Sequence, residues 1–129
     1  MCAEWVRRQP TRTAYGLDLD QKTLDWGQEH NVDPLGVDST RVHLYCKNVL
    51  DKIGTRVDAT CALNFSYCIF KERHLLLEYF RAARRSLVND GGFFIDLCGG
   101  LELGAEITER SKKGRGLTYV WDQKPYNPI

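Results

Sequence analysis

The stretch from residue 15 to residue 20, Tyr-Gly-Leu-Asp-Leu-Asp, decides how the rest of the sequence is interpreted. A buried strand is predicted over residues 13–18, because mainly small and apolar residues run up to Asp18. Asp20 is of the type that caps a helix, and a helix is predicted from there to about His30. The stretch therefore indicates a strand, an acidic turn and a helix in that order.

Strand-like and helix-like segments alternate on both sides of this stretch. Residues 2–8 are typical of the end of a helix, since two arginines suit its negative pole and Pro10 prevents its continuation. Residues 42–46 alternate in polarity, which predicts a strand at a sheet edge. Residues 58–65 are small and mostly apolar, as in a central strand that is covered on both faces.

The second half of the chain continues the alternation. A helix is predicted over residues 72–88, a turn over 89–92 and a buried strand over 93–97, followed by a Gly99-Gly100 turn. A polar helix over 101–113 and a strand over 117–121 complete the order. This alternation favours an α/β fold with a mostly parallel sheet flanked by helices.

Composition and charge limit the classes of function that the chain can have. The chain has 129 residues, 43% hydrophobic and 27% charged, which fits one folded domain. Its formal charge of +1 gives no bulk attraction to nucleic acid or to an anionic membrane. The five cysteines show neither zinc-ligand spacing nor a disulfide framework, so we expect no metal site and reduced thiols. Since no signal-peptide or membrane-spanning pattern is present, a cytoplasmic location is expected.

Ligands of open parallel sheets bind beyond the carboxyl ends of the strands, where three segments carry polar groups. Asp18 ends the first strand, and its carboxylate suits the two hydroxyls of a ribose, although plain solvation is an equal alternative. Asp20 is more simply a helix cap. Asn48 follows the edge strand and offers a donor and an acceptor to a purine, but it is also typical of a turn.

The third segment stands at the end of the strand predicted to be central and reads Asn64-Phe-Ser-Tyr67. Its amide, hydroxyl and aromatic groups stand where a substrate would meet a cofactor, or they are ordinary polar and core groups at a strand end. Asp96, near the end of the next strand, is unusual for a core position.

These segments together resemble the middle of a class I S-adenosylmethionine-dependent methyltransferase domain, over roughly residues 2–98. Residues 15–20 are similar to the family's acidic strand-end motif, and residues 45–49 are similar to the segment that contacts adenine. Residues 57–65, 81–88 and 91–95 resemble the strand and helix that end in Leu-x-Pro-Gly-Gly, with the proline missing here.

The resemblance implies S-adenosylmethionine as cofactor and methyl transfer to an unidentified acceptor. The cofactor-binding positions that it implies are Asp18, at the ribose, with Leu19, Asn48, Val49 and Asn64. The candidates for orienting the acceptor are Asn64, Ser66 and Tyr67.

One part of the family pattern has no counterpart in the sequence: the first strand and its Gly-rich loop. We therefore expect residues 1–129 to be a partial methyltransferase domain, truncated at both ends, and inactive by itself. Two alternatives stay open. One is a fragment of a nicotinamide-dependent Rossmann dehydrogenase, whose ribose is also held by an acid after the second strand. The other is a non-catalytic interaction module derived from the fold.

Overall fold

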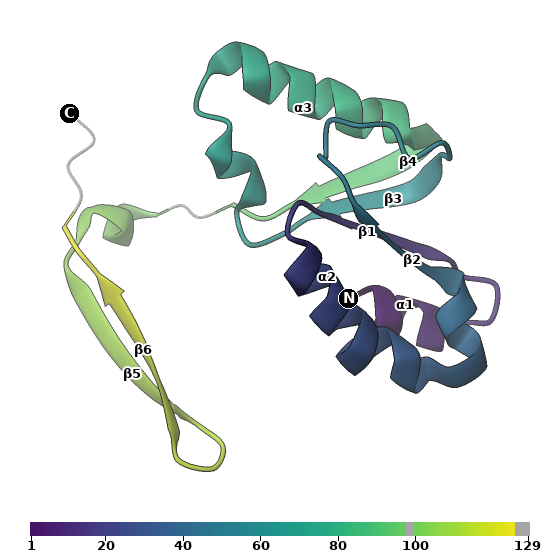
Figure 1. Cartoon of the computed structure of the whole chain (residues 1–129). Coiled ribbons are helices and arrows are strands. Elements are labelled where there is room, and N and C mark those ends of the chain that lie inside the picture. The colour runs from purple at the N-terminus through teal and green to yellow at the C-terminus, as the bar shows by residue number, and fades with distance from the viewer. Residues whose placement is uncertain (98–99, 126–129) are drawn as a thin grey trace. The chain divides into compact units, whose positions relative to one another are not determined.

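The computed structural model describes residues 1–97 and 100–125, and it is an α/β structure (Figure 1). By their contacts the residues form two compact units. The first consists of residues 1–61 and 67–94, and the second consists of residues 62–66 and the described residues from Ile95 onward. Outside the described residues lie Cys98, Gly99 and residues 126–129. The turn predicted at Gly99-Gly100 therefore falls in part outside them.

The beginning of the first unit follows the sequence prediction closely. It contains helix α1 (Cys2–Arg7), strand β1 (Ala14–Asp18), helix α2 (Gln21–Gly27) and strand β2 (Val42–Cys46). A π-helical turn (Gln28–Val32) and a 3-10 segment (Asp33–Arg41) connect α2 to β2. Strands β1 and β2 are parallel, with Ala14 opposite Val42 and Asp18 opposite Cys46. The predicted strands and the predicted helix after Asp20 are thus confirmed.

A small apolar core holds these elements together. Val6 of α1 is fully buried and packs with Ala14, Val32 and Val42, one from each neighbouring segment. Arg41 fixes the polar border of this core, because its Nη1 lies 2.7–3.1 Å from the carbonyl oxygens that end α1 and precede β1, those of Val6, Gln9 and Arg12. The packing explains why a small apolar run and an alternating pattern in the sequence were sufficient to place β1 and β2.

Gly16 lies in the same close packing. A Cβ atom at this position would lie 2.8 Å from Cδ2 of Leu44 on the neighbouring strand. The glycine of the acidic strand-end motif therefore leaves room for the Leu44 side chain, which a larger residue would displace.

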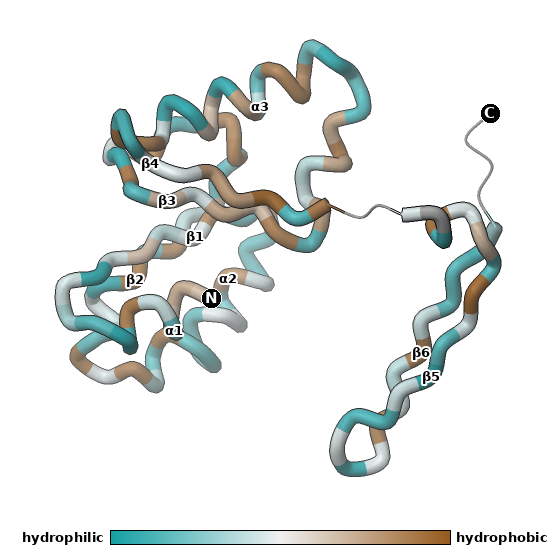
Figure 2. Tube along the Cα trace, turned by 180° about the vertical axis from the view of Figure 1, so that it is seen from behind, coloured by the Kyte–Doolittle hydropathy of each residue, from teal (hydrophilic) through white to brown (hydrophobic). Residues whose placement is uncertain are grey.

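The rest of the first unit is built around α3 (Arg73–Ser86), which follows a 3-10 turn (Ser66–Ile69) and joins β3 (Val57–Ala62) to β4 (Leu87–Ile95). Strands β3 and β4 form a two-stranded sheet separate from that of β1 and β2. Hydrophobic and hydrophilic residues alternate along α3 (Figure 2), and its buried residues are Tyr79, Ala82 and Ala83. The rings of Phe70 and Phe93 contact Tyr79 at centroid distances of 5.0 and 6.0 Å.

Two predictions about these strands were wrong. Strand β4 begins at Leu87, so residues 89–92 continue the strand instead of forming a turn. Strand β3 was expected to be covered on both faces, but Ala59 and Cys61 are exposed. Within the described residues β3 pairs with β4 alone, so its small side chains stay accessible.

The predicted polar helix over residues 101–113 was also wrong. After a short 3-10 turn (Leu101–Gly104), the chain forms an antiparallel hairpin of β5 (Ile107–Lys113) and β6 (Leu117–Gln123). Gly114 and Gly116 both have positive φ angles, 61° and 77°, which a tight hairpin connection requires. The glycines thus mark a hairpin turn and not a helix end, and the predicted strand over 117–121 is confirmed as β6. No helix among the described residues is both long and apolar enough to span a membrane.

Candidate functional site

The carboxyl ends of β1 and β2 bring two of the predicted segments together. Asp18 is opposite Cys46 in the parallel register, and the N–H of Lys47 donates to the carbonyl oxygen of Asp18 at 3.0 Å. The Sγ of Cys46 lies 3.5 Å from the carbonyl oxygen of Leu19. Asp18 and Leu19 are therefore beside the segment that leads to Asn48.

The Asp18 carboxylate is exposed at this edge. Its Oδ1 accepts a hydrogen bond from the N–H of Asp20 at 2.9 Å, which closes the acidic turn and orients the side chain. No other hydrogen bond or ion pair within the described residues involves the carboxylate, so Oδ2 is available to a ligand. Leu19 beside it is 67% exposed and offers an apolar surface. This geometry suits a neutral hydroxyl-bearing ligand next to an apolar group.

Asp20 is a helix cap. Its Oδ1 accepts from the N–H of Lys22 at 3.0 Å, and its Oδ2 accepts from Oγ1 of Thr23 at 2.9 Å. Both oxygens are occupied by the first turn of α2, and the bond from Lys22 satisfies one backbone donor that the helix itself cannot pair. Of the two acids in the motif, only Asp18 is free to bind a ligand through an unoccupied oxygen.

Asn48 forms a turn. Its Oδ1 accepts from the N–H of Leu50 at 3.0 Å, and its backbone N–H donates to Oδ2 of Asp51 at 3.2 Å. The turn occupies the acceptor of the side chain, so a purine at this edge would meet the amide NH₂ group as a donor. Val49, the next residue, is 43% exposed.

The third predicted segment has an unusual backbone. Asn64 and Phe65, both in the second unit, have φ angles of 58° and 54°, in the left-handed region that non-glycine residues seldom occupy. Asp96 holds them there, because its Oδ2 accepts from the N–H of Asn64 at 2.7 Å and its Oδ1 accepts from that of Phe65 at 2.9 Å. Such strain is typical of functional sites and persists only where surrounding contacts impose it.

The remaining candidates of this segment are divided between the units. Ser66, in the second unit, donates its hydroxyl to the carbonyl oxygen of Leu63 at 2.6 Å. Tyr67 belongs to the first unit and is partly buried. Asn64 and Asp96 thus belong to the second unit, while Asp18 and Asn48 belong to the first.

Asp96 is the residue whose role sequence reasoning missed. Its position near the end of a predicted strand was recognised as unusual for a core residue, but the partners of its carboxylate, about thirty residues earlier in the chain, follow from the pairing of β3 with β4. A carboxylate whose partners lie so far away in the sequence leaves no local signal by which these contacts could have been found. Among the described residues no group of three or more histidine, cysteine or acidic side chains is placed to hold a metal ion.

No protein-family model matches the sequence, and no curated protein is significantly similar to it. Solved structures are similar in fold. An S-adenosylmethionine-dependent methyltransferase from Clostridium acetobutylicum superimposes with a TM-score of 0.65 at 19% identity, over 89% of this chain and 47% of that one. The chain has the fold of S-adenosylmethionine-dependent methyltransferases.

A second structure with this fold is the glycopeptide N-methyltransferase MtfA in complex with S-adenosyl-L-homocysteine, with a TM-score of 0.59 at 10% identity. The match covers 95% of this chain and 57% of MtfA. The chain thus spans about half the length of the two methyltransferases. The expected Rossmann-like methyltransferase fold is confirmed, and at these identities the likeness concerns the fold alone.

Proposed function

We propose that this chain holds the ribose and adenine end of S-adenosylmethionine in a methyltransferase. The observation that carries the proposal is the Asp18 carboxylate, which is exposed at the carboxyl end of a parallel strand with Oδ2 unoccupied. A carboxylate at this place in an α/β sheet suits the hydroxyls of a nucleoside ribose. Leu19 and Val49 offer apolar contacts to adenine, and the NH₂ group of Asn48 offers a hydrogen bond.

The methyl-transfer step needs alignment more than chemical groups. S-adenosylmethionine, when bound, would supply a sulfonium methyl group for in-line displacement, so the protein would orient donor and acceptor and tolerate a positive charge that passes between them. In the proposal Asn64 or Ser66 orients the acceptor, and the rings of Phe65 and Tyr67 stabilise the charge by about 0.5–2 kcal/mol. The acceptor itself is unidentified.

The methionine end of the cofactor requires a further contributor. The sequence has no Gly-rich loop before α1, so none of its residues supplies the backbone donors that approach this part of the cofactor in the resembled family. We therefore propose that residues 1–129 act as part of a larger methyltransferase domain. A cytoplasmic location fits the proposal, since Cys2, Cys46, Cys61 and Cys68 are all free thiols.

The test is calorimetry with S-adenosylhomocysteine on the protein encoded by the full reading frame and on the 129-residue chain. Saturable binding by the former and none by the latter is expected. Saturable binding of NADH in place of S-adenosylhomocysteine would favour the dehydrogenase alternative. Binding of neither nucleotide by the full protein would contradict the proposal and favour a non-catalytic module.

A further inference from the structure

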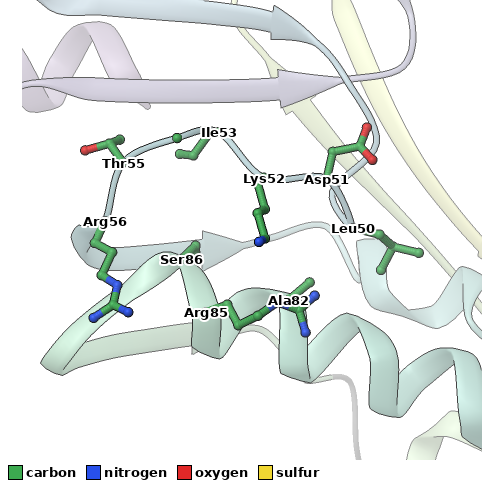
Figure 3. Close-up of a pocket in the computed structure, with 10 residues that line it drawn as sticks. Leu50, Asp51, Lys52, Ile53, Thr55, Arg56, Ala82, Arg85 and Ser86 are labelled. Atoms are coloured by element: carbon green, nitrogen blue, oxygen red, sulfur yellow. The ribbon is translucent and has the colours of Figure 1, made fainter.

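A depression of about 320 Å³ lies in the first unit, between the loop that follows β2 and the C-terminal half of α3 (Figure 3). Its volume is at the lower end of the range for small-molecule sites, about 300–1,000 Å³. Residues 50–56 form one side, and Ala82, Arg85 and Ser86 form the other. The depression is therefore of a size for a small ligand.

Three cations line the depression: Lys52, Arg56 and Arg85. The side chains of Lys52 and Arg56 extend from the loop toward α3 (Figure 3). Within the described residues none of the three forms an ion pair or a side-chain hydrogen bond, whereas Arg41 pairs with Asp38 at 2.7 Å. The basic character is local, since the whole chain carries a formal charge of only +1.

A single acid, Asp51, lines the same depression. Its side chain points away from Lys52 (Figure 3), and its Oδ2 accepts the backbone N–H of Asn48. It therefore closes the turn after β2 instead of neutralising the cations. Three like charges around one hollow repel each other, and an anion between them would relieve that repulsion.

The dipole of α3 accounts for only one of these cations. A basic residue in the last turn of a helix, such as Arg85, is stabilised by the negative pole of the helix. Lys52 and Arg56 belong to the loop, where this explanation does not apply. Gly54, between them, has a φ of 82°, and this sharp change of direction forms the loop that carries both cations.

We propose that the depression between the loop 50–56 and α3 binds a small phosphate-bearing anion, contacted by Lys52, Arg56 and Arg85. Arginine presents several donors in a planar fork that matches phosphate oxygens, and lysine adds a mobile point charge. The site differs in ligand chemistry from the edge at Asp18, where the carboxylate disfavours an anion. It is independent of the proposed methyl transfer.

The test uses inorganic pyrophosphate as the probe, by calorimetry at low ionic strength. The chain is fused to maltose-binding protein, which keeps it in solution, and the carrier alone serves as the blank. Saturable binding at one site is expected, weakened about two- to fivefold by each of Lys52→Met, Arg56→Gln and Arg85→Gln. Arg73→Gln is the matched control, since Arg73 is exposed on the same helix and does not line the depression.

A second measurement tests whether the probe contacts Lys52. Pyrophosphate is expected to slow acetylation of the Lys52 amine, followed by mass spectrometry, and to leave exposed Lys71 unaffected. The proposal is overturned if pyrophosphate does not bind saturably, if Arg73→Gln weakens binding as much as the three variants, or if both lysines are protected alike. Citrate binding of equal strength would overturn the preference for phosphate.

Discussion

The segment from α1 to β2 and the hairpin of β5 and β6 show two ways in which this chain forms strands. In the first segment the strands are parallel, and Val6, Ala14, Val32 and Val42 enclose a core against them. In the hairpin the strands are antiparallel and their apolar residues remain accessible, with Leu117 64% and Trp121 46% exposed. One segment is held by packing, while the other is held by its turn and its ladder of hydrogen bonds.

This difference explains where sequence reasoning succeeded. Around β1, the polarity pattern, the helix cap and the packing agree, because Asp20 caps α2 and the apolar side chains of Val6, Ala14, Val32 and Val42 share one core. In the hairpin they disagree, because residues 107–113 are mostly charged or polar, and they become a strand through pairing with residues 117–123. Such pairing is a property of two segments, which the helix-like polarity of one segment does not reveal.

The largest effect is expected from a charge in the core of the first segment. Val6→Asp places an unpaired carboxylate in a fully buried position, and a loss of more than about 4 kcal/mol in the free energy of unfolding is expected. Val120→Asp, in the hairpin at 43% exposure, is expected to change it by less than about 0.5 kcal/mol. Urea unfolding followed by circular dichroism measures both, and equal losses would show that the hairpin is also held by a core.

The next effect is expected at the strained turn of Asn64 and Phe65. Asp96→Ala removes the acceptor of both backbone N–H groups, each bond to the carboxylate contributing about 1.5–3 kcal/mol. Loss of hydrogen-exchange protection at these two amides is the expected result, with partial retention in Asp96→Asn, which keeps one oxygen. Unchanged protection in Asp96→Ala would mean that the turn holds without the carboxylate.

A smaller effect is expected at the helix cap. Asp20→Ala removes the acceptor of the Lys22 N–H and the Thr23 hydroxyl, which is expected to cost about 1 kcal/mol of folding stability. Asp20→Asn keeps a side-chain oxygen at the cap and is expected to retain most of that stability. Thermal unfolding compares the two, and a neutral Asp20→Ala would contradict the capping role.

The smallest effect is a difference in thiol reactivity. Burial raises the pKa of the Cys2 thiol above its usual range, so little thiolate is present there near neutral pH, whereas the side chain of Cys68 is exposed to a reagent. Alkylation of Cys2 by iodoacetamide is expected to be slower, as mass spectrometry of timed samples would show. Equal rates would indicate that α1 leaves the core readily.

The candidate site could be predicted in part. The sequence identified Asp18, because an acid that ends a strand before a capped helix is a local pattern. It left Asn48 open between a turn and a purine contact, and the structure shows the turn, while the purine contact stays a prediction. The Asp96 carboxylate accepts hydrogen bonds from the N–H groups of residues 64 and 65, which are distant from it in the sequence, so no local pattern predicts these bonds.

The affinity of Asp18→Ala for S-adenosylhomocysteine, measured by calorimetry in the protein encoded by the full reading frame, tests the central claim most directly. Since one carboxylate oxygen is already engaged by the Asp20 N–H, the variant is expected to lose at least one charge-assisted hydrogen bond of about 1.5–3 kcal/mol, or about tenfold or more in affinity. Asp20→Ala is expected to leave the affinity nearly unchanged. Unchanged affinity in Asp18→Ala would contradict the assignment of this carboxylate to the cofactor ribose.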